Sequence, residues 1–186
     1  MSAIATAATA IPAGTWAVDP VHSAVGFEVR HLGISTYRGH FPGASGRVEV
    51  DADGRIVALD GEVDLATVTT ADATLAGHLR SPDFFDVEAH PVARFRATDV
   101  RRDGDAVAVE GVLELRGIEN AVELRGTLEG VGVDPYGNDR LGLALRGTID
   151  RTAWGITWNA PLANGALAVA EKVALVLHVE AVRSAS

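Results

Sequence analysis

Apolar and polar residues alternate one by one along most of the chain, and this alternation constrains the fold more than any other feature. Successive side chains of a β-strand point to opposite faces of the sheet, so alternation is typical of strands with one dry and one wet face. The pattern occupies residues 25–30, 57–65, 93–98, 107–115, 122–129, 141–150 and 173–180. It predicts an all-β protein with few helices.

Turn residues separate these segments where hairpins require them. The turns are predicted at Asp51–Gly54, Arg102–Asp105, Arg116–Asn120 and Asp134–Asp139. Glycine also recurs inside several apolar stripes, as expected where a sheet bends sharply to close on itself. We therefore predict about eight antiparallel strands that follow one another as a meander and close into a barrel without exposed edges.

The segment Thr70–Asp86 departs from the alternation. Leu75 and Leu79 stand at the i,i+4 spacing of one helix face, and Thr70 or Asp72 precedes them as a candidate N-cap. The sequence predicts a short helical insertion between two strands.

A second helix start is predicted directly after the first helix. Ser81, Pro82 and Asp83 offer an N-cap, a residue favoured at the first helical position and a negative charge near the positive end of the helix dipole. Phe84 and Phe85 follow at once. An insertion tipped by two aromatic side chains is suited to plug one end of the barrel.

Length, charge and composition limit the functions open to the chain. With 186 residues, 47% of them hydrophobic and 22% charged, we expect one folded domain at 14–183 after a flexible leader at 1–13. The net charge of -9 opposes contact with phosphate backbones, so no nucleic-acid partner is expected. The absence of cysteine excludes thiolate metal sites.

The leader carries no Lys or Arg, and the first basic residue of the chain is Arg30. A secretory signal peptide begins with a positively charged region, so the leader does not fit one. No apolar run reaches the roughly 18 residues that a membrane-spanning helix needs. We expect a cytoplasmic protein without stable membrane insertion.

Asp19–Ser23 places Asp, His and Ser close together in the sequence. His22 and Ser23 are adjacent, so on a strand their side chains point to opposite faces and cannot share a proton. The chain also lacks the Gly-x-Ser-x-Gly motif that exposes a nucleophilic serine. We interpret the segment as a turn that His22 or Ser23 ties to a neighbour, and we predict no catalytic residue.

The six histidines stand at positions 22, 31, 40, 78, 90 and 178. None takes the His-x-His or His-Glu-x-x-His spacing that presents two imidazoles to one metal ion. Isolated histidines are more often satisfied surface or core residues than ligands. We expect neither a metal site nor a cofactor.

The densest polar and aromatic cluster consists of Arg30, His31, Tyr37, Arg38 and His40. It falls around the end of a predicted strand and its connection. The cluster either lines the mouth of the barrel, where the head of a ligand would be recognised, or forms a solvated loop.

Trp154 and Trp158 stand four residues apart near Gly155. This spacing suits a helical pair that caps the second end of the barrel. Ordinary packing in the core explains the two tryptophans almost as well.

Five stretches carry a more specific signal because they occur together and in order. They are Trp16–Ser23 (WAVDPVHS), Arg30–Gly33 (RHLG), His78–Pro91 (HLRSPDFFDVEAHP), Leu115–Val122 (LRGIENAV) and Asp134–Arg151 (DPYGNDRLGLALRGTIDR). Over nearly its whole length, the chain resembles the YceI-like family of polyisoprenoid-binding, lipocalin-like proteins. It departs from that pattern at Ala153-Trp154, which replaces Asp-Phe, and in lacking the secretion signal of many members.

The resemblance implies a lipocalin-like antiparallel barrel that holds a long isoprenoid or similar amphiphilic tail and has no catalytic centre. A homodimer is common in that family and is the expected partner state. The apolar stripes support a hollow interior because they mix Leu, Val and Phe with Gly and Ala. The side chains expected to contact the tail are Val25, Phe27, Val29, Phe41, Phe84, Phe85, Phe95, Leu113, Leu128, Leu143, Leu145, Trp154, Trp158, Leu175 and Leu177. The polar mouth is expected to comprise His22, Arg30, His31, Tyr37 and Arg38.

We therefore expect a non-catalytic protein that carries or sequesters a long-chain apolar amphiphile, such as a polyisoprenoid or an isoprenoid quinone. Two alternatives remain. One is a hydrolase or transferase that acts on a lipid-like substrate through His22 or the Arg30–His40 cluster. The other is a partner-binding module with a solid core, which would release no lipid on extraction.

Overall fold

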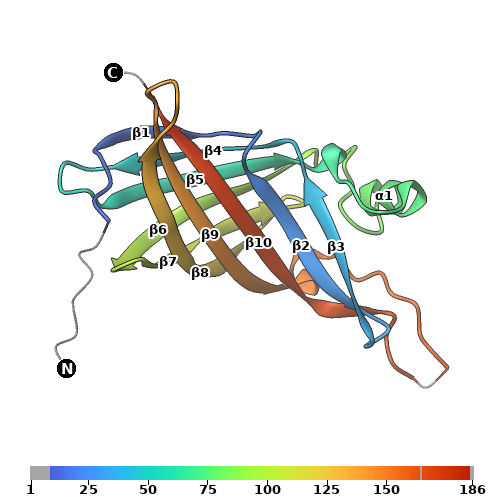
Figure 1. The fold of residues 1–186 in the computed structure, drawn as a ribbon. Coiled ribbons are helices and arrows are strands. Elements are labelled where there is room, and N and C mark those ends of the chain that lie inside the picture. Colours follow the sequence, from blue (N-terminus) through green and yellow to red (C-terminus); the bar gives the residue numbers. More distant parts are fainter. Residues whose placement is uncertain (1–8, 164, 185–186) are drawn as a thin grey trace.

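The computed structural model describes residues 9–163 and 165–184 and shows an all-β protein whose strands wrap into a barrel (Figure 1). Within these residues one α-helix, α1 (Ala73–Arg80), and two 3-10 helices, η1 (Leu65–Thr67) and η2 (Arg151–Trp154), accompany the sheet. None of these helices is long and apolar enough to cross a lipid bilayer. The strands are β1 (Gly14–Val18), β2 (Ala24–His31), β3 (Ser35–Phe41), β4 (Ala44–Val50), β5 (Ile56–Asp64), β6 (Val92–Asp103), β7 (Ala106–Leu115), β8 (Ile118–Val133), β9 (Asp139–Asp150) and β10 (Val169–Arg183).

β1 closes the barrel by pairing with both β4 and β10. Trp16 lies opposite Val48 on β4 and opposite Arg183 on β10. Going round from β1, the order is β4, β5, β6, β7, β8, β9 and β10, so the described residues form a closed antiparallel ring of eight strands. The predicted fold class is therefore confirmed.

The predicted meander is correct from β4 to β10 and wrong for the first strands. β1 pairs with β10 at Ala181–Arg183, and β2 pairs with the same edge of β10 farther back, at Val169–His178. The two strands thus behave as halves of one long strand interrupted at Asp19–Ser23. β3 pairs with β2 and extends the sheet beyond the ring, so the Arg30–His40 cluster lies mainly on a hairpin and not in a solvated loop.

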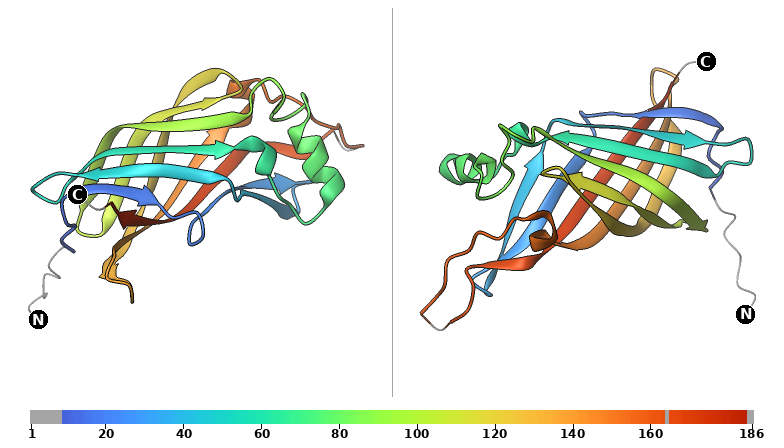
Figure 2. Two further views of the ribbon diagram at one scale, coloured as in Figure 1. Left: turned by 90° about the horizontal axis from the view of Figure 1, so that it is seen from above. Right: turned by 180° about the vertical axis from the view of Figure 1, so that it is seen from behind.

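The insertion between β5 and β6 covers the gap beside β3. His40 on the free edge of β3 exchanges two backbone hydrogen bonds with Thr69, at 3.1 and 2.9 Å. From there α1 stands against this end of the barrel (Figure 2). The Asp72 carboxylate accepts a hydrogen bond from the Leu75 N–H at 2.8 Å, which confirms the predicted helix and one of its two candidate caps.

The second helix predicted at Ser81–Asp83 is wrong. α1 ends at Arg80, and the chain turns back through hydrogen bonds from Phe85 N to Leu79 O and from Asp86 N to Ser81 O, both 2.9 Å. Asp86 takes a left-handed φ of 52°, which a continuing helix does not allow. The early reversal is what directs the two phenylalanines toward the barrel.

Part of the predicted leader packs on the domain. Residues 1–8 lie outside the described residues, but Ile11 is buried in the core. The backbone carbonyl of Pro12 accepts a hydrogen bond from Trp16 Nε1 at 3.3 Å, and Arg102 donates to the carbonyl of Thr9. Residues 9–13 are therefore held between hairpin ends instead of forming a free leader.

The alternation over residues 57–65 places Val57, Leu59 and Val63 on the apolar face, but Val57 is exposed. The register of β4 and β5 shifts between Glu49 and Val50, so Ile56 is buried and Val57 points outward. Beyond this bulge, Leu59 and Val63 keep the predicted inward face.

Candidate ligand-binding cavity

A cavity of about 380 Å³ occupies one part of the barrel interior. Every described strand contributes to its wall, and inward-facing aliphatic and aromatic side chains make up most of it. Of the fifteen side chains expected to contact a tail, the wall includes Val25, Phe27, Val29, Phe41, Phe84, Phe85, Phe95, Leu113, Leu143, Leu145, Trp158, Leu175 and Leu177. The structure thus gathers these residues around one space.

The opposite part of the barrel is filled by side chains. Trp16 is fully buried there, and it shares the core with Ile11, Val109 and Leu141, none of which lines the cavity. Leu128 was expected to contact a tail, but it belongs to this filled part. The barrel is therefore solid at one end and hollow toward the other.

Two glycines let phenylalanine rings lie flat against the wall. Gly39 stands opposite Phe27 in the β2–β3 pairing, and a Cβ at Gly39 would lie 2.5 Å from the ring atoms Cε1 and Cζ of Phe27. A Cβ at Gly111 would collide in the same way with Phe95. Because the glycines have no side chains, the rings occupy the wall and leave the lumen open.

Phe85 joins the insertion to the barrel wall. Its ring lies 6.1 Å from Phe27 and 5.6 Å from Phe41, centroid to centroid, with edge-to-face geometry. Such pairs are favourable beyond the area that they bury. Phe85 therefore fixes the insertion over the hollow part of the barrel, as the plug interpretation predicted.

A second aromatic cluster connects α1 to the loop after η2. The His78 ring on α1 lies 4.9 Å from Phe84 and 4.8 Å from Trp158, edge-on to both. His78 Nε2 is 3.0 Å from Asp83 Oδ2, which orients the imidazole. Since these three rings line the cavity, they form a rim between the insertion and the loop.

Trp154 and Trp158 do not form a helical pair. Trp154 ends η2, is buried and donates from Nε1 to the Leu113 carbonyl at 3.1 Å, outside the cavity wall. Gly155 follows with a φ of 71°, a left-handed conformation that stops the helix and sends Trp158 into a separate loop. Only Trp158 of the two reaches the cavity.

Arg151 is a buried cation in the cavity wall. It is not among the site residues expected from the sequence. Its guanidinium donates to the backbone carbonyls of Ile156 at 2.6 Å, Ala170 at 3.0 Å and Val169 at 3.3 Å. Burial lowers the pKa of this arginine, but an arginine stays charged in proteins. Arg151 therefore anchors both ends of the loop between η2 and β10.

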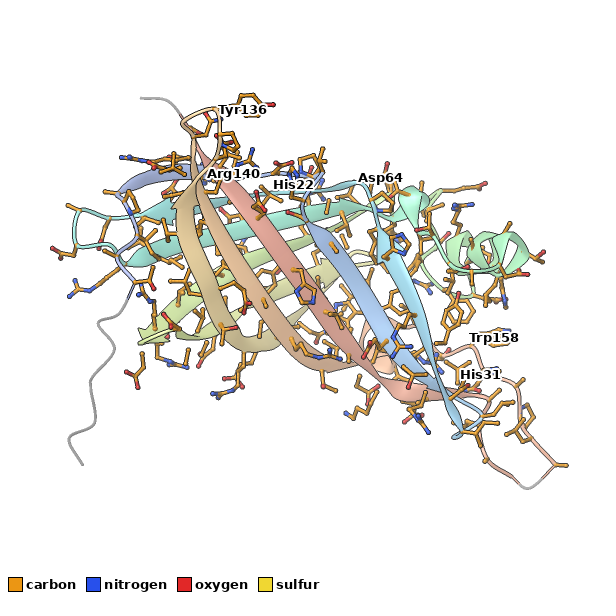
Figure 3. All side chains as sticks on the ribbon, viewed as in Figure 1. His22, His31, Asp64, Tyr136, Arg140 and Trp158 are labelled. Carbon is orange, nitrogen blue, oxygen red and sulfur yellow. The ribbon has the colours of Figure 1, made fainter. Side chains whose placement is uncertain are left out.

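The structure separates the residues predicted as a polar mouth. His22 and His31 lie at opposite ends of β2, because a strand of this length is extended (Figure 3). His31 and Tyr37 line the cavity, whereas His22, Arg30 and Arg38 do not. Arg38 instead donates to the exposed-face carboxylate of Glu28 at 2.9 Å.

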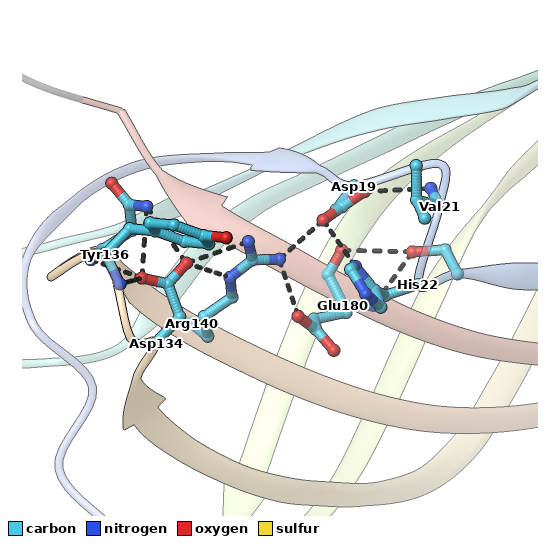
Figure 4. A network of polar contacts seen from close by, with 9 residues as sticks. Asp19, Val21, His22, Asp134, Tyr136, Arg140 and Glu180 are labelled. Carbon is cyan, nitrogen blue, oxygen red and sulfur yellow. Dashed lines mark hydrogen bonds and ion pairs between the residues drawn. The ribbon is translucent and has the colours of Figure 1, made fainter.

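His22 belongs to a network that ties the β1–β2 connection to the end of the barrel (Figure 4). Asp19 Oδ2 is 2.9 Å from His22 Nδ1 and accepts from Arg140 Nη1 at 2.6 Å. The same Arg140 donates to Glu180 at 2.7 Å and to Asp134 at 3.0 Å. The predicted turn at Asp19–Ser23, tied to a neighbour, is thus confirmed.

This network has the chemistry of a structural ion cluster. Hydrogen bonds from His22 and Arg140 hold the pKa of Asp19 well below its usual range. Ligand atoms of Asp19, His22 and Glu180 lie within 4.8 Å of one another, but Arg140 already places its positive charge between the two carboxylates. Ser23 is bound to the backbone of Glu180, at 3.0 and 3.1 Å, and so does not serve His22 as a nucleophile.

Several wall residues were absent from the predicted set. Leu115, Ile149, Val173 and Val179 follow the same alternation as the predicted ones and could have been found by extending it. Leu75 and Leu79 reach the cavity from α1, which strand periodicity does not reveal.

Comparison with known proteins agrees with this architecture. A YceI-like domain matches residues 16–181. A relative from Pectobacterium atrosepticum, UPF0312 protein ECA1782, is 34% identical over 163 residues, which cover 87% of this chain and 82% of the relative. Among solved structures, the Campylobacter jejuni YCEI protein has a TM-score of 0.73 at 25% identity, covering 84% of this chain and 90% of that one. A polyisoprenoid binding domain from Saccharophagus degradans has a TM-score of 0.67 at 15% identity, covering 93% and 100%.

Proposed function

The chain belongs to the YceI-like family, and from this premise we propose that its barrel binds a long-chain apolar amphiphile and carries or sequesters it without catalysis. A polyisoprenoid or an isoprenoid quinone is the proposed ligand class. The polyisoprenoid-binding description of one structural neighbour supports a lipid ligand.

The observation that carries this proposal is the apolar cavity. Its volume of about 380 Å³ falls in the range of ligand sites in proteins. If such a space stayed empty, the free energy of unfolding would be lower by about 9 kcal/mol at about 24 cal/mol per Å³ of cavity. This loss is as large as the whole stability of many domains. A bound tail restores the missing contacts, so occupancy and stability are expected to rise together.

A non-catalytic role is supported by the placement of polar groups. The side chains of Asp19 and Ser23 are engaged in the network outside the cavity, and the hydrogen bonds of Arg151 go to backbone carbonyls. The wall also includes His31, Tyr37 and His78, but most of it is aliphatic and aromatic, so it is suited to hold an apolar tail by packing.

Native mass spectrometry before and after organic extraction tests the proposal. We expect the purified protein to carry an apolar amphiphile that extraction removes, and we expect the extracted protein to melt at a lower temperature. A protein that has only its sequence mass before extraction, and takes up no added polyprenol or isoprenoid quinone, would support the solid-core alternative instead.

A further inference from the structure

Two neighbouring segments project beyond the barrel at the end that holds the cavity (Figure 1, Figure 2). One is the β2–β3 turn, residues 31–35, and the other is the loop of residues 159–163 and 165–168. Leu32 N donates to Ala168 O at 2.7 Å, and His31 lies opposite Val169 in the pairing of β2 with β10. The two segments therefore form one protrusion, which we name the apolar tip.

The apolar tip exposes large aliphatic side chains. Ile34 is 79% exposed, Leu167 46% and Leu32 38%. None of the 14 described residues of the tip is Asp, Glu, Lys or Arg, although 22% of the chain is charged, which would give about three in a segment of that length. An exposed surface of this kind marks a site of contact with another apolar surface.

The tip is continuous with the wall of the cavity. His31 and Ala168 belong to both the tip and the cavity wall, and Trp158 lines the wall just before the loop begins. Whatever covers the tip therefore lies next to the cavity wall. A bilayer in that place makes the apolar contact and can also supply an apolar ligand, whereas a second copy of the chain makes only the contact.

Arg30 adds a charge that suits the head groups of a bilayer. Its guanidinium supports the turn by donating to Gly33 O at 2.7 Å and to Thr36 Oγ1 at 3.3 Å. Among the described residues, no carboxylate forms an ion pair with this guanidinium. At the base of an apolar tip, a free cation is placed to meet lipid phosphates while the aliphatic side chains enter the acyl boundary.

We propose that the apolar tip docks reversibly on a lipid bilayer, so that the ligand passes between bilayer and cavity without crossing water. This inference rests on the proposed function, because it assumes a ligand that dissolves in membranes. The chain has a net charge of -9, which an anionic surface repels. Docking should therefore depend on the aliphatic side chains and should occur on phosphatidylcholine vesicles without added anionic lipid.

Flotation of the delipidated full chain with phosphatidylcholine vesicles tests the docking step. The test variant is Ile34→Asp with Leu167→Asp. The matched control is Val57→Asp with Val133→Asp, two valines that are exposed on the barrel away from the tip. We expect vesicle affinity to fall at least about tenfold in the tip variant, because two aliphatic side chains no longer leave water. The control should stay within about twofold of the parent.

Three results would overturn the proposal: no flotation of the parent, equal weakening of both double variants, or flotation that the tip variant retains. Sedimentation velocity without vesicles tests whether a second copy of the chain covers the tip instead. A parent that is a dimer and a tip variant that is a monomer would assign the tip to self-association. If the aspartates prevent folding, Ile34→Ser with Leu167→Ser replaces them. Because the protein is delipidated, the outcome is independent of the mass-spectrometric test of the cavity.

Discussion

Leu143 and Ala144 are neighbours on β9 with opposite roles. Leu143 is buried and lines the cavity, whereas Ala144 faces the other side of the wall, as the period of two requires. At the residue scale, therefore, one position changes the volume of the lumen and the next leaves it unchanged.

We predict that Leu143→Trp reduces the amount of co-purified lipid and leaves the melting temperature of the delipidated protein close to that of the parent. The added ring enters space that a tail would use. In a filled core the same substitution would cost about 1–3 kcal/mol of stability by overpacking. Ala144→Gln is the control and should change neither lipid retention nor melting. A large loss of stability in Leu143→Trp with no lipid in the parent contradicts the carrier function.

At the scale of elements, the hollow part of the barrel depends on how β2 and β3 pair. Gly39 faces Phe27 across the pair, and the flat ring leaves the lumen open. Phe27 also contacts Tyr37, Phe41 and Phe85, so one glycine supports the packing of the hairpin against the insertion.

We predict that Gly39→Ala lowers lipid retention, because its Cβ forces the Phe27 ring off the wall and into the cavity. The lost ring contacts would cost about 1–2 kcal/mol of the free energy of unfolding. Gly132→Ala is the control, since Gly132 on β8 lies outside the cavity wall and a Cβ there would meet no atom within 4 Å. Lipid extraction and urea unfolding of both variants check this expectation. Equal behaviour of the two alanine variants would contradict it.

At the scale of the whole molecule, Arg140 holds together segments that are distant in the sequence. This residue links the β1–β2 connection, the β8–β9 turn and β10, close to the place where β1 completes the ring. Hydrogen bonds from Asn138 and Arg140 hold the pKa of Asp134 well below its usual range, as those from His22 and Arg140 do for Asp19. Both carboxylates therefore favour the folded state when ionised.

The pH dependence of stability follows from the sign of these shifts. A carboxylate whose pKa is lower in the folded state contributes its full stabilisation above the unfolded value of about 3.9 and loses it as the pH falls toward the folded value. We predict that the melting temperature of the parent declines below about pH 4. In Asp19→Asn with Asp134→Asn the melting temperature should be lower at neutral pH, and its decline in acid should be shallower.

Asp53→Asn is the control for that experiment, because Asp53 lies exposed in the β4–β5 turn and pairs with Arg55. Its acid decline should match that of the parent. A double variant whose decline is as steep as the parent's would show that the Arg140 network does not govern acid stability.

Much of the fold follows from local chemistry that the sequence displays directly. Alternation identified seven strands and the inward side of β9, the candidate caps Thr70 and Asp72 indicated the start of α1, and Asp19 with Pro20 identified a turn. Each of these features depends on residues a few positions apart, through the period of a strand, a helix cap or an Asx turn. The ordered motifs of the YceI-like family are likewise visible in the sequence alone.

Only the tertiary structure decided where the barrel is hollow. Leu128 and Leu143 lie opposite each other in the β8–β9 pairing and both point inward, yet only Leu143 borders the cavity. Likewise His22 precedes β2 and His31 ends it, so the extended strand holds them apart, and Phe27 lies flat because a glycine on another strand faces it. The period of a strand determines which face a side chain takes. Whether that side chain meets a neighbour or an open space depends on pairing between strands that are distant in sequence, which alternation does not encode.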